Sequence, residues 1–312
     1  MSAPIVLEVA LNGVTKKAQN SAAPETHAEI AADALACFGE GAAIVHTHTT
    51  RPSPTPQAFA EDYLGAYRRV LAAKPDAILY PTVGFGIDGT ARYDHVAHLA
   101  EAGAIRQAVL DPGSVNLGAS GADGWPAPMD FVYANSPNDV RHMAELCRKH
   151  GLGPSIAIFE PGWLRVILAM QRAGTLPPGA LVKLYFAAGG YLQAERSGAR
   201  SEAKPSEVNA AAGEPSFSTP PIPEAFEMYM AMLRGSGLSW AVAVLGGGIF
   251  DTPIAELAVQ RGGHLRVGLE DHAGAKSNVD EVRKAKALCE KHGRRLATCA
   301  EAEALLGIPG RA

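Results

Sequence analysis

The 312-residue sequence predicts an α/β fold, a closed (β/α)8 TIM barrel, on three observations. Short runs rich in β-branched residues alternate with longer amphipathic runs, and eight such cycles follow one another along the chain. The short runs are almost continuously apolar, which is typical of parallel strands covered by helices on both faces. Eight cycles spread over roughly 250 residues or more are the number that closes a barrel. An open doubly wound sheet is the main alternative, but no GxGxxG motif follows the first strand.

The expected elements follow each other in a regular strand-then-helix order. The strands are expected at residues 5–12, 42–49, 77–83, 107–111, 155–160, 181–187, 239–245 and 264–270. The helices are expected near residues 27–38, 57–73, 90–103, 136–150, 163–174, 222–235, 252–262 and 278–292, with a further short helix at 299–307. We expect residues 1–312 to form a single barrel domain.

Local signals explain several of these boundaries. Thr26 or Glu25 can cap the first helix, because each offers a side-chain oxygen to free backbone N–H groups. Pro161 can open the fifth helix, since proline suits a first helical turn. Asn278 is expected to cap the last long helix, and Gly293 follows its end.

Two connections are longer than usual, and both come after strands. They cover residues 112–135 and 188–221. In a barrel, the segments that follow strands lie on the catalytic face, and long segments there are usually binding loops or lids. We expect the second connection to cover a bound substrate.

Composition excludes several classes of partner. The net charge is −4 and no long basic block is present, so we expect no nucleic acid and no anionic membrane as partner. No apolar stretch approaches the ~20 residues of a membrane span, and the first residues do not resemble a secretion signal. The four cysteines form no CxxC pair, which indicates buried thiols and a cytoplasmic protein.

A pair of histidines ends the second expected strand, in "IVHTHTTRP". His46 and His48 stand two residues apart, so in a strand they project to the same side. Two imidazoles placed in this way can bind one divalent metal, although two hydrogen-bonded core histidines would give the same pattern. We favour the metal site.

A third ligand is expected at the end of the eighth strand, in "HLRVGLEDHAG". A catalytic zinc ion typically has three protein ligands, for example His2Glu, and one open position. Strands two and eight are both even, so their inward side chains can meet in one layer, which favours Glu270. Asp271 would face the opposite way if the strand continued, and it could carry out acid–base chemistry. Arg266 shares the face of Glu270, and burying it requires an anionic partner or substrate.

Other strand ends supply polar groups that can meet a small anionic substrate. "GGGIFD" at residues 246–251 can bind an anion through backbone N–H groups where it enters a helix. The candidate substrate-binding residues are Asn12, Thr82, Ser114, Asn116, Glu160 and Gly247.

Five motifs occur in an order that resembles a known family. They are "VHTHTTRP", "PTVGFG", "DPGSVN", "AVAVLGGG" and "RVGLED", after strands two, three, four, seven and eight. Together they resemble the β-keto acid cleavage enzymes, typified by 3-keto-5-aminohexanoate cleavage enzyme, over about residues 5–305. The combination of HxH with RxGxED is the most specific part of the likeness.

The resemblance implies an activity and roles for individual residues. It implies a homo-oligomeric barrel, a dimer or tetramer, with one Zn²⁺ per subunit. It also implies that a small β-keto acid reacts with acetyl-CoA as co-substrate to give acetoacetate and a new acyl-CoA. Carried over by motif, His46, His48 and Glu270 resemble the zinc ligands, Asp271 the general base and Arg266 its charged partner. Thr82 and Ser114 fall where the family has hydroxyl residues near the substrate.

One departure from the family pattern concerns the substrate. The family commonly carries a glutamate two residues before the strand-five phenylalanine, whereas this chain has Ala157 there. The substrate is therefore expected to differ from 3-keto-5-aminohexanoate. Alternative functions are a metal-dependent aldolase or hydrolase that does not use CoA, and a barrel that binds ligand without activity.

Overall fold

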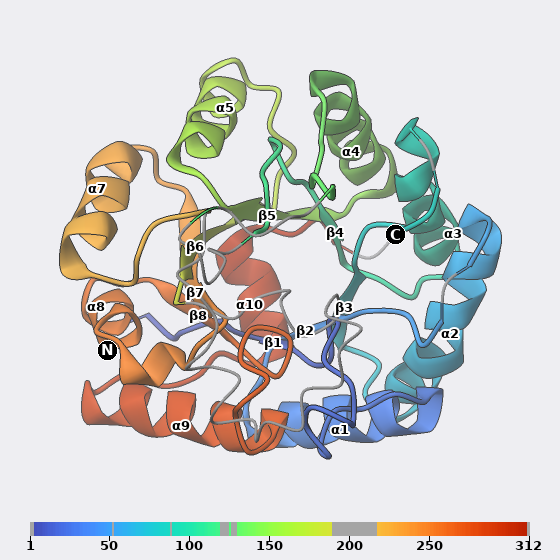
Figure 1. Cartoon of the computed structure of the whole chain (residues 1–312), viewed down its shortest axis with the longest axis horizontal. Coiled ribbons are helices and arrows are strands. Elements are labelled where there is room, and N and C mark those ends of the chain that lie inside the picture. The colour runs from blue at the N-terminus through green and yellow to red at the C-terminus, as the bar shows by residue number, and fades with distance from the viewer. Residues whose placement is uncertain are drawn as a thin grey trace.

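The computed structural model shows eight parallel strands arranged as a nearly closed barrel inside a ring of helices (Figure 1). It describes residues 3–51, 53–87, 89–118, 125, 130–188 and 217–310. The strands are hydrogen-bonded in the order β3-β2-β1-β8-β7-β6-β5-β4. Between β3 and β4, the backbone N–H of Arg106 donates to the carbonyl oxygen of Leu79 at 3.1 Å. The predicted (β/α)8 fold is confirmed.

The elements have the following bounds. The strands are β1 (Leu7–Ala10), β2 (Ile44–Thr47), β3 (Ile78–Pro81), β4 (Gln107–Val109), β5 (Gly153–Ile158), β6 (Leu181–Ala187), β7 (Ser239–Leu245) and β8 (His264–Val267). The helices are α1 (His27–Glu40), α2 (Pro56–Ala73), η1 (Gly89–Tyr93), α3 (His95–Glu101), α4 (Pro137–His150), α5 (Pro161–Arg172), α7 (Pro223–Leu233), η3 (Ile249–Asp251), α8 (Ile254–Gln260), α9 (Asn278–Lys291) and α10 (Cys299–Leu306).

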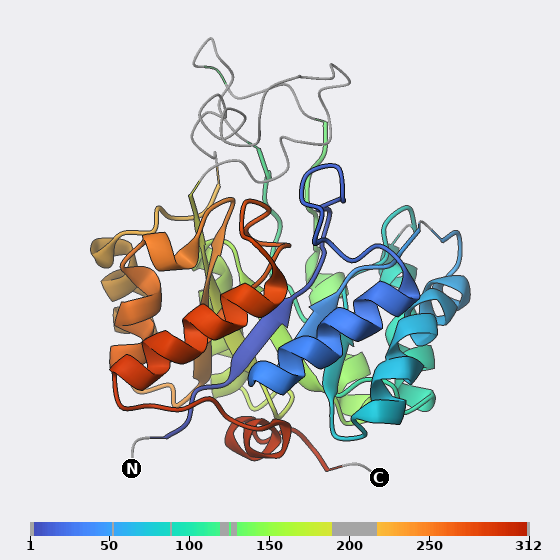
Figure 2. The same cartoon turned by 90° about the horizontal axis from the view of Figure 1, so that it is seen from below.

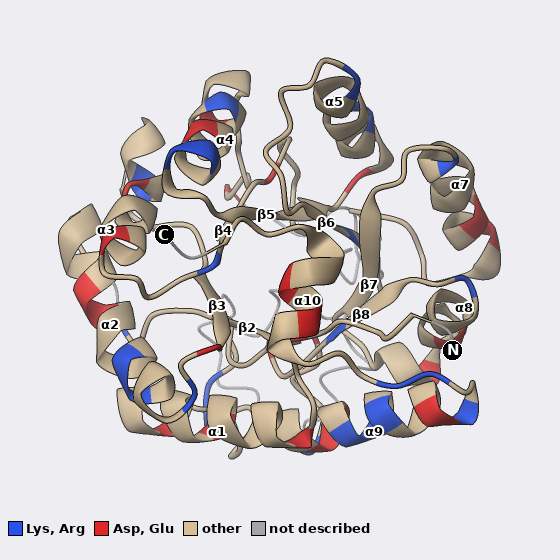
Figure 3. Cartoon of the chain, turned by 180° about the vertical axis from the view of Figure 1, so that it is seen from behind, with Lys and Arg blue, Asp and Glu red and all other residues tan. Residues whose placement is uncertain are grey.

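The two ends of the barrel are different. Helix α10 lies across the end at which the strands begin, on the same side as both termini (Figures 2 and 3). Arg106, just before β4, is held there by Glu303 of α10, with Nε 2.7 Å from Oε1. The carboxyl ends of the strands point away from α10, so the histidine and acidic motifs lie at the opposite end, where barrel enzymes place their active sites.

The strand ends differ from the sequence prediction at β8. The strand was expected to reach residue 270, but it stops at Val267. Gly268 follows with φ +136°, and a Cβ there would lie 2.1 Å from the carbonyl oxygen of Ala10. Only glycine allows the chain to turn so closely against β1. This turn decides where Glu270 and Asp271 point.

One of the two predicted helix N-caps is confirmed, and the other lies one residue away. Thr26 caps α1 with a complete capping box, as expected. Asn278 was the expected cap of α9, but Ser277 is the cap, and its Oγ accepts from the N–H of Asp280. The Asn278 side chain is instead buried between β1 and the turn after β8, where its Oδ1 accepts from the N–H of Leu269 at 2.8 Å.

None of the helices in the described part of the chain is both long and apolar enough to cross a membrane. All four cysteines are buried and free. Most of the loop at 188–221, expected to cover a substrate, lies outside the described residues.

Candidate active site

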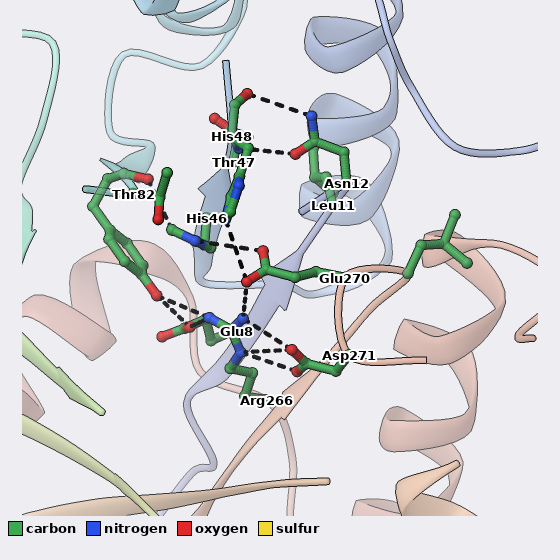
Figure 4. A network of polar contacts seen from close by, with 12 residues as sticks. Glu8, Leu11, Asn12, His46, Thr47, His48, Thr82, Arg266, Glu270 and Asp271 are labelled. Carbon is green, nitrogen blue, oxygen red and sulfur yellow. Dashed lines mark hydrogen bonds and ion pairs between the residues drawn. The ribbon is translucent and has the colours of Figure 1, made fainter. Parts of the chain in front are cut away.

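His46 on β2 and His48 just after it point toward the carboxylate of Glu270 (Figure 4). Nε2 of His46 lies 3.4 Å from Oε2 of Glu270, and Nε2 of His48 lies 3.5 Å from Oε1. One ligand atom from each residue falls within 4.8 Å of the other two. The structure thus brings together the three predicted metal ligands from segments more than 200 residues apart.

The backbone around Glu270 is built for close packing. The N–H of Glu270 donates to the carbonyl oxygen of Ala10 at 3.2 Å, which ties the turn to the end of β1. Gly13 has φ +53°, and a Cβ there would lie 2.3 Å from Cγ of Glu270. Glycine at position 13 therefore makes room for the glutamate side chain.

Asn12 supports the histidine segment. Its Oδ1 accepts from the N–H of His48 at 2.9 Å, and its Nδ2 donates to the carbonyl oxygen of His48 at 3.4 Å. Asn12 is buried and is not among the residues that line the cavity described below. Its observed contacts position His48.

Arg266 joins the acidic residues of the site. Its Nη2 donates to Oε1 of Glu270 at 2.9 Å and to Oδ1 of Asp271 at 2.9 Å. Its Nε lies 3.0 Å from Oδ2 of Asp271, and its Nη1 lies 2.7 Å from Oε1 of Glu8. Glu270 and Asp271 were expected to face opposite ways if the strand continued. The strand ends before them, and the turn brings both carboxylates to one guanidinium.

Burial and charge set the protonation of these groups. Burial lowers the pKa of His46 to about 3, so its imidazole is neutral at pH 7, which is the form that binds metals. Burial alone would raise the pKa of Glu270, but the imidazole of His46 and the guanidinium of Arg266 hold it well below its usual value. Burial raises the pKa of Asp271 to about 6, against the opposing charge of Arg266. Asp271 can therefore exchange a proton near neutral pH.

The three residues fit a divalent metal. Two imidazoles and one carboxylate form a donor set typical of catalytic zinc. Oε2 of Glu270 is buried and accepts no hydrogen bond from the described residues. Nδ1 of His46 lies 3.3 Å from the carbonyl oxygen of Tyr80, which leaves Nε2 as its ligand atom.

A cavity of about 300 Å³ opens beside this cluster. His46, His48, Glu270 and Arg266 line it, whereas Asp271 is buried next to Arg266 and does not. The remaining lining residues are mostly apolar or aromatic: Val14, Tyr80, Thr82, Val83, Phe85, Val109, Asp111, Leu117, Phe131, Tyr133, Ser155, Ala157, Phe159, Lys183 and Tyr185.

Among the predicted substrate-binding residues, the structure brings Thr82 to the cavity wall. Ser114 is exposed, and its Oγ donates to the carbonyl oxygen of Asn135 at 3.2 Å. Asn116 is also exposed, and Gly247 lies beside Ala188. Glu160 accepts from the N–H of Ser218 at 2.7 Å. These four residues are not part of the described cavity lining, so their contact with substrate stays a prediction.

A buried charge network around Glu8 lies next to the cluster, and the sequence analysis did not predict it. Oε1 of Glu8 accepts from Nζ of Lys183 at 3.0 Å and from the hydroxyl of Tyr80 at 2.5 Å, in addition to Arg266. Burial would raise the pKa of Glu8, but Lys183 and Arg266 lower it to about 2. The available signal was a charged residue inside each of two apolar strands, "IVLEVALN" and "LVKLYFA".

Asp111, just after β4, was also missed as a cavity residue. Its Oδ1 accepts from the N–H of Ala157 at 3.2 Å, and its Oδ2 accepts from the hydroxyl of Tyr133. Burial raises the pKa of Asp111, while the hydrogen bond from Tyr133 opposes this effect. At the position where the family commonly has a glutamate, the chain thus has Ala157 with a carboxylate from the neighbouring strand beside it.

Comparisons with known proteins identify the family of this chain. The sequence profile of the beta-keto acid cleavage enzyme family matches residues 4–308. The chain is 26% identical to 3-keto-5-aminohexanoate cleavage enzyme from Fusobacterium nucleatum, covering 99% of both chains. It is also 26% identical to 3-oxoadipate:acetyl-CoA acetyltransferase from Cupriavidus necator, covering 99% of this chain and 96% of the relative.

Among solved structures, ObcA in complex with oxaloacetate shares the fold, with a TM-score of 0.64 and 17% identity. The match covers 93% of this chain and 68% of that protein. The family match extends over almost the whole sequence and includes every residue of the cluster at the carboxyl end of the barrel. The chain therefore belongs to the β-keto acid cleavage enzyme family and is an enzyme that acts on β-keto acids.

Proposed function

We propose that the protein is a zinc-dependent enzyme that transfers an acyl group from a β-keto acid to CoA, with acetyl-CoA as co-substrate. The products are acetoacetate and the acyl-CoA of the remaining chain. The observation that carries this proposal is the close approach of His46, His48 and Glu270 at one wall of the cavity, in a chain of this family. These three residues would hold the metal.

Zinc in this position would act as a Lewis acid toward the oxygens of the keto acid. Asp271 is the proposed base for the carbon between the keto and carboxyl groups; it lies next to Arg266 outside the described cavity lining, so the substrate carbon would have to come within hydrogen-bond reach of it. Arg266 positions Asp271 through two hydrogen bonds and keeps its ionised form available, since the guanidinium charge favours the carboxylate. Tyr80 and Asn12 orient the two histidine ligands by contacts with His46 and His48.

The reaction then exchanges two acyl groups between the β-keto acid and the CoA thioester. The carbanion formed by proton removal attacks the carbonyl carbon of the acetyl thioester, and a C–C bond forms. The C–S bond of acetyl-CoA breaks, and the CoA thiolate attacks the original keto carbon. The older C–C bond then breaks to give the new acyl-CoA, and the acetoacetate carbanion takes back the proton held by Asp271. The apolar and aromatic walls of the cavity keep water from this sequence, which would otherwise hydrolyse the thioester.

A substrate screen tests the proposal. Short β-keto acids are incubated with zinc-loaded protein and acetyl-CoA, and acetoacetate and new acyl-CoA thioesters are measured by mass spectrometry. We expect both products in equal amounts from at least one acid. Keto acid consumption that does not need acetyl-CoA would instead indicate an aldolase or hydrolase.

A further inference from the structure

Two Lys or Arg side chains line the described cavity, Lys183 on β6 and Arg266 on β8. The hydrogen bonds of Arg266 occupy its Nε and both of its Nη atoms. Their acceptors are carboxylate oxygens and one hydroxyl, from Asp271, Glu270, Glu8 and Tyr80. A guanidinium group has five N–H donors, so Arg266 can donate to a substrate oxygen only if one of these bonds breaks.

Lys183 still has a donor that these contacts do not use. An ammonium group has three N–H donors. Nζ of Lys183 donates to Oε1 of Glu8 at 3.0 Å and to the hydroxyl oxygen of Tyr80 at 2.6 Å. The O–H of Tyr80 is itself donated to Glu8, so its oxygen is the acceptor toward Lys183. Within the described part of the chain, the third N–H of Lys183 has no hydrogen-bond acceptor and is available to a ligand in the cavity.

The surroundings of Lys183 strengthen a charged hydrogen bond. The residue is only 3% exposed, and its Nζ lies 4.9 Å from the ring centre of Tyr80 and 6.0 Å from that of Tyr185. Burial lowers the pKa of Lys183, while the charges of Glu8 and Asp111 oppose this effect. Away from bulk water, a fixed cationic donor stabilises an anionic oxygen more strongly than the same donor does in solvent.

Tyr80 connects Lys183 to the metal-binding cluster. Its ring stacks on His46, with the ring centres 4.4 Å apart, and its hydroxyl contacts Nζ of Lys183. The cluster and Lys183 therefore lie on adjoining parts of the same cavity wall. A keto acid held at the cluster has its reactive carbon in this cavity, and the acetyl thioester must approach that carbon.

The attack on acetyl-CoA produces a negatively charged oxygen that needs a donor. When the carbanion bonds to the carbonyl carbon of the thioester, the electron pair of the C=O bond moves onto the acetyl oxygen. The pair returns when the C–S bond breaks and the thiolate leaves. In the proposed function the oxygens of the keto acid belong to the metal site, so the acetyl oxygen requires a different partner.

We propose that Lys183 is a catalytic residue that donates its third N–H to the acetyl oxygen of the thioester and stabilises the oxyanion formed there. The assignment rests on the proposed function, because it takes acetyl-CoA as the group that the carbanion attacks. Glu8 and Tyr80 position the ammonium group. Lys183 acts after the keto acid has lost its proton, so it is needed for C–C bond formation and not for proton removal.

Two half-reactions of the full-length, zinc-loaded protein separate these steps. Proton removal is measured without acetyl-CoA, as enzyme-dependent deuterium uptake in D2O at the carbon between the keto and carboxyl groups. Acyl transfer is measured with acetyl-CoA, as formation of acetoacetate. Lys183→Met has a side chain of similar length without an N–H donor. Acyl transfer should fall roughly 100- to 1,000-fold in this variant, while deuterium uptake and zinc content stay within about twofold of the wild type.

Two further variants make the comparison specific. Lys284→Met is the matched control, because Lys284 also pairs with a buried carboxylate, that of Glu281 at 2.8 Å, but lies outside the cavity lining. It should leave both half-reactions unchanged. Lys183→Gln keeps an uncharged N–H donor, so acyl transfer should fall less than in Lys183→Met, again without loss of deuterium uptake. If Lys183→Met does not fold, Lys183→Gln decides the question.

Infrared spectroscopy gives a readout that does not depend on turnover. Acetyl-CoA labelled with ¹³C at the thioester carbonyl is bound to the protein in the absence of keto acid. A hydrogen bond from Lys183 weakens the C=O bond, so the carbonyl band should lie at a lower wavenumber in the wild type than in Lys183→Met. Lys284→Met should show the wild-type band.

Three results would overturn the assignment: full acyl transfer in Lys183→Met, equal losses of deuterium uptake and acyl transfer, or the same carbonyl band in the wild type and in Lys183→Met. Equal losses would mean that Lys183 only supports the structure of the site. A wild-type protein that takes up deuterium but forms no acetoacetate from acetyl-CoA would contradict the proposed reaction itself, and the role of Lys183 with it.

Discussion

Arg266 binds Asp271 through two nitrogens, with Nε 3.0 Å from Oδ2 and Nη2 2.9 Å from Oδ1. Such a planar, two-point contact fixes the orientation of the carboxylate. Nη2 also reaches Glu270, so one guanidinium holds both the proposed base and a proposed metal ligand. The chemistry of the site therefore depends on the geometry of the turn after β8.

The Asp271→Asn variant separates proton transfer from metal binding. Asparagine is similar in shape but is not a useful base, so we expect turnover to fall by roughly 100- to 10,000-fold. Zinc content should stay at the wild-type level, because Asp271 is not one of the three clustered ligand residues. Steady-state kinetics and metal analysis of the same preparation check both parts. Full activity in Asp271→Asn would show that the base is another residue.

The Asn12→Ala variant tests the support of the histidine segment. It removes two hydrogen bonds to the backbone of His48, so this residue should be less well positioned, and zinc affinity should fall roughly 10-fold. Competition with a chelator gives the affinity. Gln171→Ala serves as the control, because Gln171 on α5 also bonds a backbone carbonyl, that of Ser236, away from the site. Equal losses in both variants would contradict a specific role for Asn12.

Two substitutions in the buried network around Glu8 should lower the free energy of unfolding by different amounts. Glu8→Gln leaves Lys183 and Arg266 without their shared buried anion, and should lower the free energy of unfolding by about 3–5 kcal/mol. Lys183→Met leaves Glu8 paired with Arg266, and should cost about 1–3 kcal/mol. Urea unfolding of both variants gives the comparison. A larger loss in Lys183→Met would mean that Arg266 does not compensate Glu8.

His264 should make stability depend on pH. Burial lowers its pKa to about 4, and its Nδ1 accepts from the N–H of Val6 at 3.0 Å, so the folded protein keeps it neutral. The unfolded chain binds the proton near pH 6.5, so this contribution to stability is complete above that pH and is lost as the pH falls toward 4. The loss should reach about 3 kcal/mol.

His264→Asn removes this titration while its Oδ1 can replace Nδ1 as acceptor. The free energy of unfolding of the variant should change less between pH 6.5 and pH 4 than that of the wild type. If the free energy of unfolding fell equally with pH in the wild type and in His264→Asn, His264 would not be the source of the pH dependence.

The sequence predicted the barrel because eight apolar strands alternate with helices, a pattern that depends on local periodicity alone. It also predicted the cluster of His46, His48 and Glu270, because residues at the carboxyl ends of barrel strands meet on one face. The orientation of Asp271 was not predictable in this way. It depends on the positive φ of Gly268 and its contact with Ala10, which belongs to a distant strand.

Contacts between strands that are distant in the sequence could not be predicted either. Glu8 and Lys183 are 175 residues apart, and only the register of the whole barrel brings them together. Asp111 is held by Tyr133, which lies across a long connection that has no periodic pattern. A charged residue inside an apolar strand indicates that a buried partner exists, but it does not identify that partner.

The most direct test of the metal site is a crystal structure of the zinc-loaded protein with anomalous diffraction at the zinc edge. We predict one anomalous peak per chain, about 2.0–2.2 Å from Nε2 of His46, Nε2 of His48 and a carboxylate oxygen of Glu270, with at least one coordination position open to the cavity. No peak between these three residues, with the imidazoles turned away from Glu270, would contradict the account.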